Sequence, residues 1–134
     1  MDSNTQLKDA ELLFKEESYK IVGLAMKVHT KLGKGFKEVV YKDALEIELQ
    51  KEQIPYLREE RFDILYDEVI LRHKFDADFF VYDSIIIEVK AATITPYDTF
   101  KQTLNYLKAS KVKLGIILNF GMDKLEFKRV VCTY

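Results

Sequence analysis

The sequence predicts an α/β domain in which helices pack on a mixed β-sheet, with the elements in the order α-α-β-β-β-α-β-β. Three features of the sequence indicate this architecture. Apolar residues recur at helical spacing up to about residue 53, and they alternate with polar residues from about residue 61. A third helix then precedes two further apolar segments, so that helices and strands mix along one chain of 134 residues.

Two helices are predicted first. Apolar residues three or four positions apart form one stripe within residues 11–32, which is typical of a helix that packs on a core. Gly33 and Gly35 follow, and glycine favours the end of a helix because it adopts left-handed backbone angles easily. A second helix is expected over residues 38–53, and Pro55 ends it.

Strands are predicted next. Residues 61–71 alternate around a turn at Asp67 and Glu68, and the odd positions from 69 to 81 are apolar except for His73. Such a period of two predicts a strand with one buried face.

A third helix is predicted from Pro96, with Thr95 as its N-cap and Asp98 at its third position, an arrangement that resembles a capping box. Residues 112–120 and 125–131 are expected to form two more strands, which completes the predicted order.

The length of the loop around residues 82–84 decides where four charged side chains lie. If the loop contains these three residues, Asp78 lies opposite Glu88 and Asp76 lies opposite Lys90. A loop shorter by one residue would mix charged and apolar side chains on each face, so we predict the three-residue loop. The apolar face would then consist of Phe75, Ala77, Phe79, Val81, Ile85, Ile87 and Val89.

Two interpretations of the charged face stay open at this point. Asp78 and Glu88, at a cross-strand distance of roughly 5 Å, repel each other unless a proton, a lysine or a divalent cation neutralises them. Mg²⁺ prefers oxygen ligands, commonly one or two carboxylates with waters and substrate phosphate, and Lys90 would then orient water or meet phosphate charge. The alternative is a solvated sheet face with cross-strand pairs of aspartate and lysine.

Composition limits the other possibilities. A net charge of −1 argues against binding of nucleic acid by bulk electrostatics alone. The single cysteine, Cys132, excludes an intrachain disulfide, which favours a cytoplasmic protein. We expect residues 1–134 to form one domain with no membrane span, in which residues 1–10 are loosely ordered.

The segment "VHTKLGKGFKEVVYKDAL" at residues 28–45 closely resembles the signature of the GxxExxY family, here Gly35, Glu38 and Tyr41. This family is grouped with the PD-(D/E)XK nuclease superfamily. The resemblance continues through Asp78, Glu88 and Lys90, then "QTLNYL" and "LNFG", and it covers roughly residues 15 to 131. The proline of the "PD" pair is absent, because Ala77 precedes Asp78.

The resemblance implies a restriction-endonuclease-like core with a metal-dependent phosphodiesterase site. By position, Asp78 and Glu88 would be metal ligands, Lys90 would be the catalytic lysine, and Glu38 would be a further ligand or water-holding group. Gln102 would point into the site from the helix that follows the sheet strands. The remaining accessory candidates are Tyr41, Asp76, His29 and Tyr106.

We therefore expect a nuclease that depends on Mg²⁺ or Mn²⁺ and hydrolyses phosphodiester bonds, in DNA in preference to RNA. A homodimer is expected because so small a domain covers little DNA. Two other classes compete with this interpretation. One is a catalytically inert module that binds nucleic acid or a protein, and the other is a metal-dependent phosphoesterase acting on small molecules.

Overall fold

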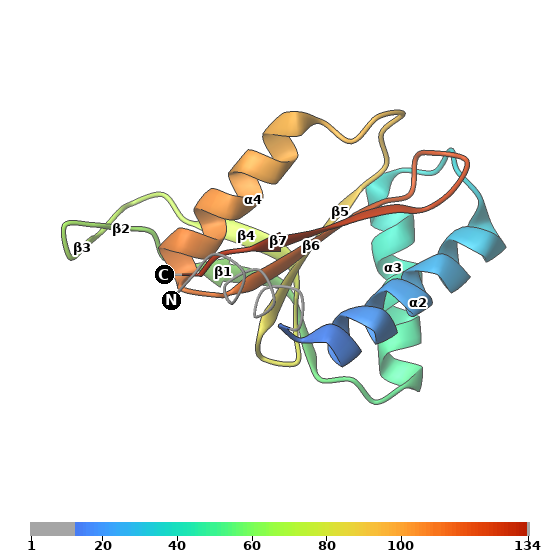
Figure 1. The fold of residues 1–134 in the computed structure, drawn as a ribbon, viewed down its shortest axis with the longest axis horizontal. Coiled ribbons are helices and arrows are strands. Elements are labelled where there is room, and N and C mark those ends of the chain that lie inside the picture. The colour runs from blue at the N-terminus through green and yellow to red at the C-terminus, as the bar shows by residue number, and fades with distance from the viewer. Residues whose placement is uncertain (1–12, 134) are drawn as a thin grey trace, which may run out of the picture.

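The computed structural model describes residues 13–133, and the expectation for residues 1–10 lies outside this range. The helices are α2 (Lys15–Leu32), α3 (Glu38–Lys51) and α4 (Tyr97–Ser110) (Figure 1). The strands are β1 (Tyr56–Phe62), β2 (Leu65–Tyr66), β3 (Val69–Ile70), β4 (Phe75–Val81), β5 (Ile85–Lys90), β6 (Leu114–Asn119) and β7 (Glu126–Val131).

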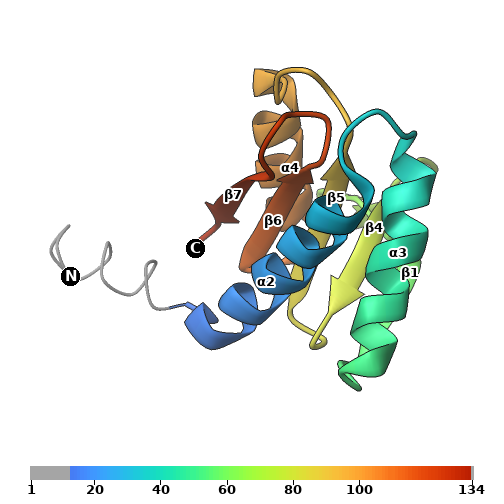
Figure 2. The same cartoon turned by 90° about the vertical axis from the view of Figure 1, so that its right-hand side faces the viewer.

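Five of these strands form one mixed sheet in the order β1-β4-β5-β6-β7, in which only β5 and β6 are parallel. Helices α2 and α3 cover one face of the sheet and α4 covers the other (Figure 2). One core lies on each side: Ile21, Ala25 and Leu45 pack with strand residues below α2 and α3, and Leu107 packs below α4. The predicted mixed sheet flanked by helices is confirmed.

The hairpin between β4 and β5 has the predicted register. Phe79 pairs with Ile87 and Val81 pairs with Ile85, so residues 82–84 form a three-residue loop. This arrangement puts Asp78 and Glu88 on adjacent strands at the same level of the sheet.

The predicted single apolar face of β4 is wrong. Phe79 and Val81 pack below α2 and α3, as expected, but Phe75 and Ala77 pack on the opposite side, with the core below α4. The change of side occurs at Asp78, where the pairing between β1 and β4 is interrupted.

The interruption coincides with an unusual backbone conformation in β1. Glu59 has a φ of 57°, in the left-handed region, and the ladder skips Glu59 and Asp78 although Arg58 pairs with Phe79 and Glu60 with Ala77. An L-residue other than glycine rarely adopts this conformation within a strand. At the same level of the sheet, the apolar side chains of β4 change from one face to the other.

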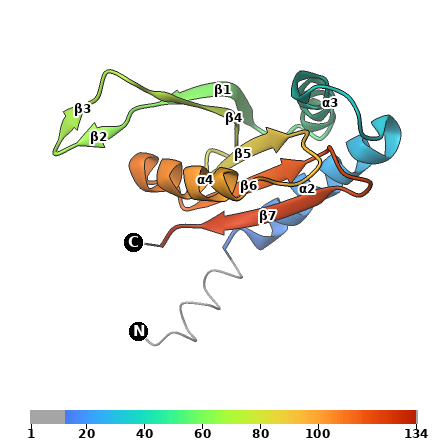
Figure 3. The same ribbon diagram turned by 90° about the horizontal axis from the view of Figure 1, so that it is seen from above.

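Two element boundaries differ from the prediction. Strand β1 begins directly after Pro55 rather than near residue 61, and the expected strand over 69–81 is split into β3 and β4. The turn at Asp67 and Glu68 is confirmed, with φ values of 47° and 68°. It joins β2 and β3 into a separate two-stranded sheet that projects from the body of the protein (Figure 3).

The N-cap prediction for the third helix is also wrong. Helix α4 begins at Tyr97 after an extended Pro96, one residue later than predicted. The hydroxyl oxygen of Thr95 accepts a hydrogen bond of 2.9 Å from the side-chain amide of Asn119. Thr95 thus ties the segment before α4 to the end of β6. Among residues 13–133, no helix combines the length and the apolar character that crossing a membrane requires.

Candidate functional site

Asp78 lies where β4 and β5 part. The pairing of these strands ends at Phe79 and Ile87, and beyond it the Oδ2 atom of Asp78 accepts the backbone N–H of Val89 at 2.7 Å. A side chain therefore replaces a backbone acceptor of the ladder. This bond fixes one carboxylate oxygen of Asp78 and leaves Oδ1 directed to other partners.

Glu88 lies beside Asp78 on β5. Burial, together with the negative charge of Asp78, raises the pKa of Glu88 from its ordinary value of 4.5 to about 8, although the positive charges of Lys90 and Lys42 oppose the increase. The Oε1 atom of Glu88 is buried, and no group in the described part of the chain donates a hydrogen bond to it. An unsatisfied buried carboxylate oxygen is costly, and a proton or a cation would relieve it.

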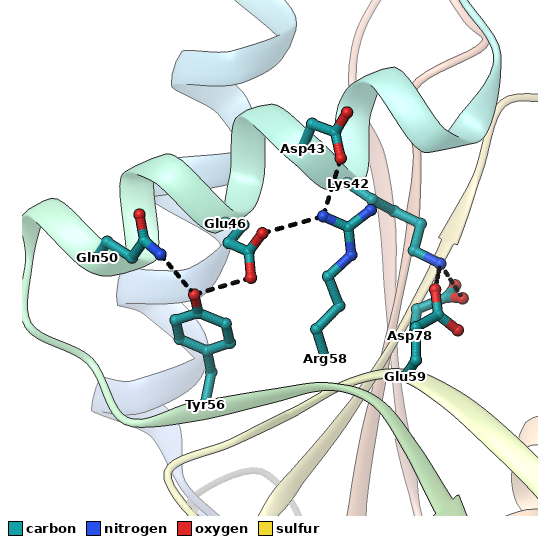
Figure 4. Close-up of polar contacts among 8 residues, drawn as sticks. All are labelled: Lys42, Asp43, Glu46, Gln50, Tyr56, Arg58, Glu59 and Asp78. Carbon is teal, nitrogen blue, oxygen red and sulfur yellow. Dashed lines mark hydrogen bonds and ion pairs between the residues drawn. The ribbon is translucent and has the colours of Figure 1, made fainter.

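Lys42 of α3 supplies a positive charge to this site (Figure 4). Its Nζ atom lies 3.1 Å from Oδ1 of Asp78 and also forms an ion pair with Glu59. The Lys42 side chain is only 12% exposed. Burial opposes its charge, but the hydrogen bonds to Glu59 and Asp78 outweigh burial and raise the pKa of Lys42 above its ordinary value.

A second polar network holds β1 against α3 next to Lys42 (Figure 4). Arg58 donates to Asp43 at 2.8 Å and to Glu46 at 3.0 Å, and the hydroxyl group of Tyr56 donates to Glu46 at 2.8 Å. These contacts fix the strand that carries Glu59. The position of the Lys42 ion pairs is therefore set by packing between α3 and β1.

Lys90 is the last residue of β5. Glu88 and Lys90 are two positions apart on one strand, so their side chains leave the same face of the sheet. The Lys90 side chain is partly buried, and its charge lowers the pKa of Glu88 against the stronger effect of burial. Lys90 thus lies close enough to Glu88 to influence it electrostatically.

The "LNFG" motif fixes the backbone that follows both central strands. Buried Asn119 pairs with Lys90 across β5 and β6, and its Oδ1 atom accepts the N–H groups of Ala92 and Gly121 at 3.0 Å each. A Cβ atom at Gly121 would lie 2.4 Å from the backbone nitrogen of Ala92, so only glycine fits. This motif therefore braces the end of the strand that carries Lys90.

Tyr41 and His29 brace loops. Tyr41 is fully buried and stacks on Phe120 at 4.6 Å, while its hydroxyl group donates to the carbonyl of Gly33 at 2.6 Å. The Nε2 atom of His29 lies 2.8 Å from the carbonyl oxygen of Met122. Both side chains hold loops, Tyr41 the loop at Gly33 and His29 the loop at Met122, and neither forms a hydrogen bond with Asp78 or Glu88 among the contacts of residues 13–133.

Asp76 is not brought together with the other acidic residues. Its carboxylate forms two hydrogen bonds with Arg61 of β1, at 2.8 and 3.3 Å, and both side chains are exposed. The predicted place of Asp76 opposite Lys90 is therefore wrong. The pairing of β4 with β5 stops at Phe79, whereas β4 pairs with β1 on both sides of Asp78, and Arg61 is the β1 residue opposite Asp76.

Three further residues of the predicted site lie on helices α3 and α4. Glu38 is exposed in the first turn of α3 and lines an open pocket with Ala91, the residue after Lys90. Gln102 is exposed on α4. Tyr106, one turn further along, stacks on Phe75 at 4.0 Å, and burial followed by the charge of Glu88 raises its pKa.

Sequence reasoning missed Lys42 and Glu59. Lys42 lies four residues after Glu38, on the same side of α3, and this spacing was a usable signal. Glu59 had no such signal, because its residue type does not indicate a left-handed conformation.

The site offers two carboxylates for a metal ion. Within residues 13–133, no group of three His, Cys, Asp or Glu side chains forms a complete metal site. Mg²⁺, however, is commonly held by one or two carboxylates, with waters and substrate phosphate completing its shell. Asp78 and the unsatisfied oxygen of Glu88 fit such a partial site.

Comparison with known proteins places this arrangement in a family. Residues 15–130 match the sequence model of the PD-(D/E)XK nuclease superfamily. The chain belongs to this superfamily. PD-(D/E)XK nucleases typically use divalent metal ions.

One solved structure supports the fold of this PD-(D/E)XK chain. The crystal structure of SSO0001 matches it with a TM-score of 0.55 and 19% sequence identity, over 71% of this chain and 50% of that one. The chain thus spans about half the length of that protein. The predicted restriction-endonuclease-like fold is confirmed. No curated protein matches the sequence.

Proposed function

We propose that this chain is a PD-(D/E)XK nuclease of the GxxExxY type that forms a single domain over residues 1–134. It would hydrolyse phosphodiester bonds, in DNA in preference to RNA, with Mg²⁺ or Mn²⁺ as the cofactor. The observation that supports this most strongly is the meeting of Asp78 and Glu88 where β4 and β5 part, with Lys90 two residues further along β5.

In this proposal each group of the site has a distinct role. Asp78 and Glu88 would hold the ion, Asp78 through Oδ1 because Oδ2 is bound to Val89. When bound, a divalent ion would supply electrostatic stabilisation of the phosphate and a more acidic water. Lys90 would position that water and stabilise negative charge that develops on the phosphate.

Glu38 and Gln102 would act from the margin of the site. The exposed Glu38 side chain lines the pocket next to Ala91, which suits a group that holds water or a second ion near the end of β5. Gln102 would contact the substrate from α4. Homodimer formation and a cytoplasmic location remain predictions from the sequence.

Cleavage assays with single- and double-stranded DNA and RNA test the proposal. The wild-type protein should cleave in Mn²⁺ or Mg²⁺ and lose activity in a chelator. Lys90→Ala should lower the rate about 100-fold or more, because charge stabilisation in the transition state is lost. Lys113→Ala is the matched control. Lys113 is an exposed lysine directly before the first residue of β6, at the end of that strand away from Asn119.

Each outcome discriminates between function classes. Equal cleavage by the wild type and Lys90→Ala would assign the activity to a different protein or site. Binding of Mn²⁺ and nucleic acid without cleavage would favour the inert binding module. Cleavage confined to small phosphodiesters would favour a small-molecule phosphoesterase.

A further inference from the structure

Lys42 binds the oxygen atom of Asp78 that the proposed metal ion would bind. Oδ2 of Asp78 is bound to the N–H of Val89, so Oδ1 is the oxygen that the proposed ion would bind. That oxygen is 3.1 Å from Nζ of Lys42. A divalent ion bound to Oδ1 therefore competes directly with the Lys42 ammonium group.

We propose that Lys42 is a positioning residue. Its ammonium group binds Asp78 in place of the ion in the metal-free protein, and it moves away from Asp78 when the ion binds there. This inference rests on the proposed function, because it takes Asp78 and Glu88 as the metal ligands. Lys42 is a positioning residue because it acts through Asp78 and not on the substrate.

The surroundings of Lys42 suit such an exchange. The ammonium group is shared between Asp78, whose side chain is 19% exposed, and Glu59, whose side chain is 52% exposed. When an ion takes Oδ1, Glu59 remains as an anionic partner nearer to solvent. Lys42 can then move to Glu59 without becoming an unpaired charge in a poorly hydrated site.

The metal-free site also requires a cation at this position. The Asp78 carboxylate is only 19% exposed, and the Lys42 ammonium group, which is bound to Asp78 and to Glu59, balances its charge there. Without Lys42, Asp78 would face Glu88 and Glu59 with no ammonium group directly bound to it. Lys42 therefore holds the carboxylates in place before the ion arrives, at the cost of weaker ion binding.

The test compares three proteins by calorimetric titration with Mn²⁺ and by thermal unfolding without metal. Lys42→Met keeps the length of the side chain and removes its charge. It should unfold at a lower temperature without metal and bind Mn²⁺ about tenfold more tightly, the scale expected when a like charge a few ångström away is removed. Lys42→Arg keeps the charge and should bind Mn²⁺ within about twofold of the wild type.

Lys27→Met controls for the loss of one positive charge. Lys27 forms an ion pair of 2.9 Å with Glu48, between α2 and α3 and outside the site. This variant should bind Mn²⁺ like the wild type. A gain in affinity equal to that of Lys42→Met would overturn the inference, because it would reflect net charge alone.

The remaining outcomes separate this inference from the proposed function. If the wild type binds Mn²⁺ and Lys42→Met binds it equally or less tightly, Lys42 does not compete with the ion, while the metal site stands. If neither protein binds Mn²⁺, both proposals fail. If Lys42→Met does not fold, Glu59→Gln replaces it: loss of the second anion should weaken Mn²⁺ binding, and an unchanged affinity would overturn the inference.

Discussion

The carboxylate of Asp78 accepts the backbone N–H of Val89 at 2.7 Å, at the level of the sheet where β4 and β5 stop pairing. The aspartate of the candidate site is therefore also part of the sheet's hydrogen bonding. Its second oxygen binds Lys42, so a single side chain links β4, β5 and α3. Substitutions at this position test stability and chemistry together.

Asp78→Ala should destabilise the metal-free protein by about 2–3 kcal/mol, because it removes an acceptor from a partly buried N–H and a partner from partly buried Lys42. Asp78→Asn retains an acceptor for Val89, so its loss should be smaller by about 1 kcal/mol. Urea unfolding at pH 7 measures both free energies of unfolding. An Asp78→Ala protein as stable as the wild type would contradict the structural role.

The raised pKa of Glu88 makes stability depend on pH. Its folded-state pKa of about 8 lies above the ordinary value of 4.5, so the folded protein binds more protons than the unfolded chain between these values. The contribution of Glu88 is therefore full below about pH 4.5 and decreases as the pH rises towards 8. The slope should approach about 1.4 kcal/mol per pH unit.

Glu88→Gln isolates this contribution from other titrating groups. The difference in unfolding free energy between the wild type and Glu88→Gln should change steadily from pH 5 to pH 8, with the variant relatively more stable at the alkaline end. Urea titrations without metal at each pH value give this difference. A constant difference over that range would show that Glu88 titrates normally.

Binding of Mn²⁺ should release protons and strengthen as the pH rises. A carboxylate must lose its proton to bind a metal, and Glu88 holds that proton up to about pH 8. The affinity should therefore increase by up to about tenfold per pH unit below 8. Calorimetry in buffers with different ionisation enthalpies counts the released protons.

Asp76 and Asp78 form a matched pair for the same measurement. Asp78→Asn should weaken Mn²⁺ binding at least about tenfold, since a metal-ligating charge is lost. Asp76 lies on the same strand, and its carboxylate binds exposed Arg61. Asp76→Asn should therefore leave the affinity for Mn²⁺ unchanged. Equal effects of the two substitutions would mean that Asp78 is not a specific ligand.

Gly121→Ala should destabilise the protein by about 1–3 kcal/mol, because its new Cβ atom would lie within 2.6 Å of backbone atoms of Ala91 and Ala92. Gly23→Ala is the control. A methyl group at Gly23, within α2, would meet no atom within 4 Å, and alanine there should stabilise by about 0.5–1 kcal/mol. Thermal unfolding of both variants checks the opposite signs.

The sequence predicted the register of the hairpin that carries the site because the residues next to the loop, Phe79 and Val81 on β4 and Ile85 and Ile87 on β5, do share one face. The same rule failed for β1, where Arg58 and Glu60 are partly buried and Leu57 is half-exposed. Arg58 is satisfied there by Asp43 and Glu46 of α3, a contact that hydropathy does not indicate. Because polar residues of β1 point inward, the hydropathy pattern did not indicate the first part of this strand.

The candidate site was predicted only in part for a similar reason. Asp78, Glu88 and Lys90 lie within one hairpin, so local periodicity brings them together. Lys42 reaches Asp78 from a helix 36 positions earlier in the chain, and its meeting with Glu59 depends on how α3 packs on β1. Contacts of this kind are set by tertiary packing and leave no period in the sequence.

The three-residue loop between β4 and β5 also affects how the protein folds. Asp78 and Val89 are only 11 positions apart, so their bond belongs to the most local class of tertiary contact and can form early. Early closure of this hairpin would bring the two acidic side chains together before the rest of the sheet assembles. The rate at which this hairpin forms should accordingly depend on salt concentration and pH. The same two carboxylates, of Asp78 and Glu88, would then affect both the folding rate and the proposed metal binding.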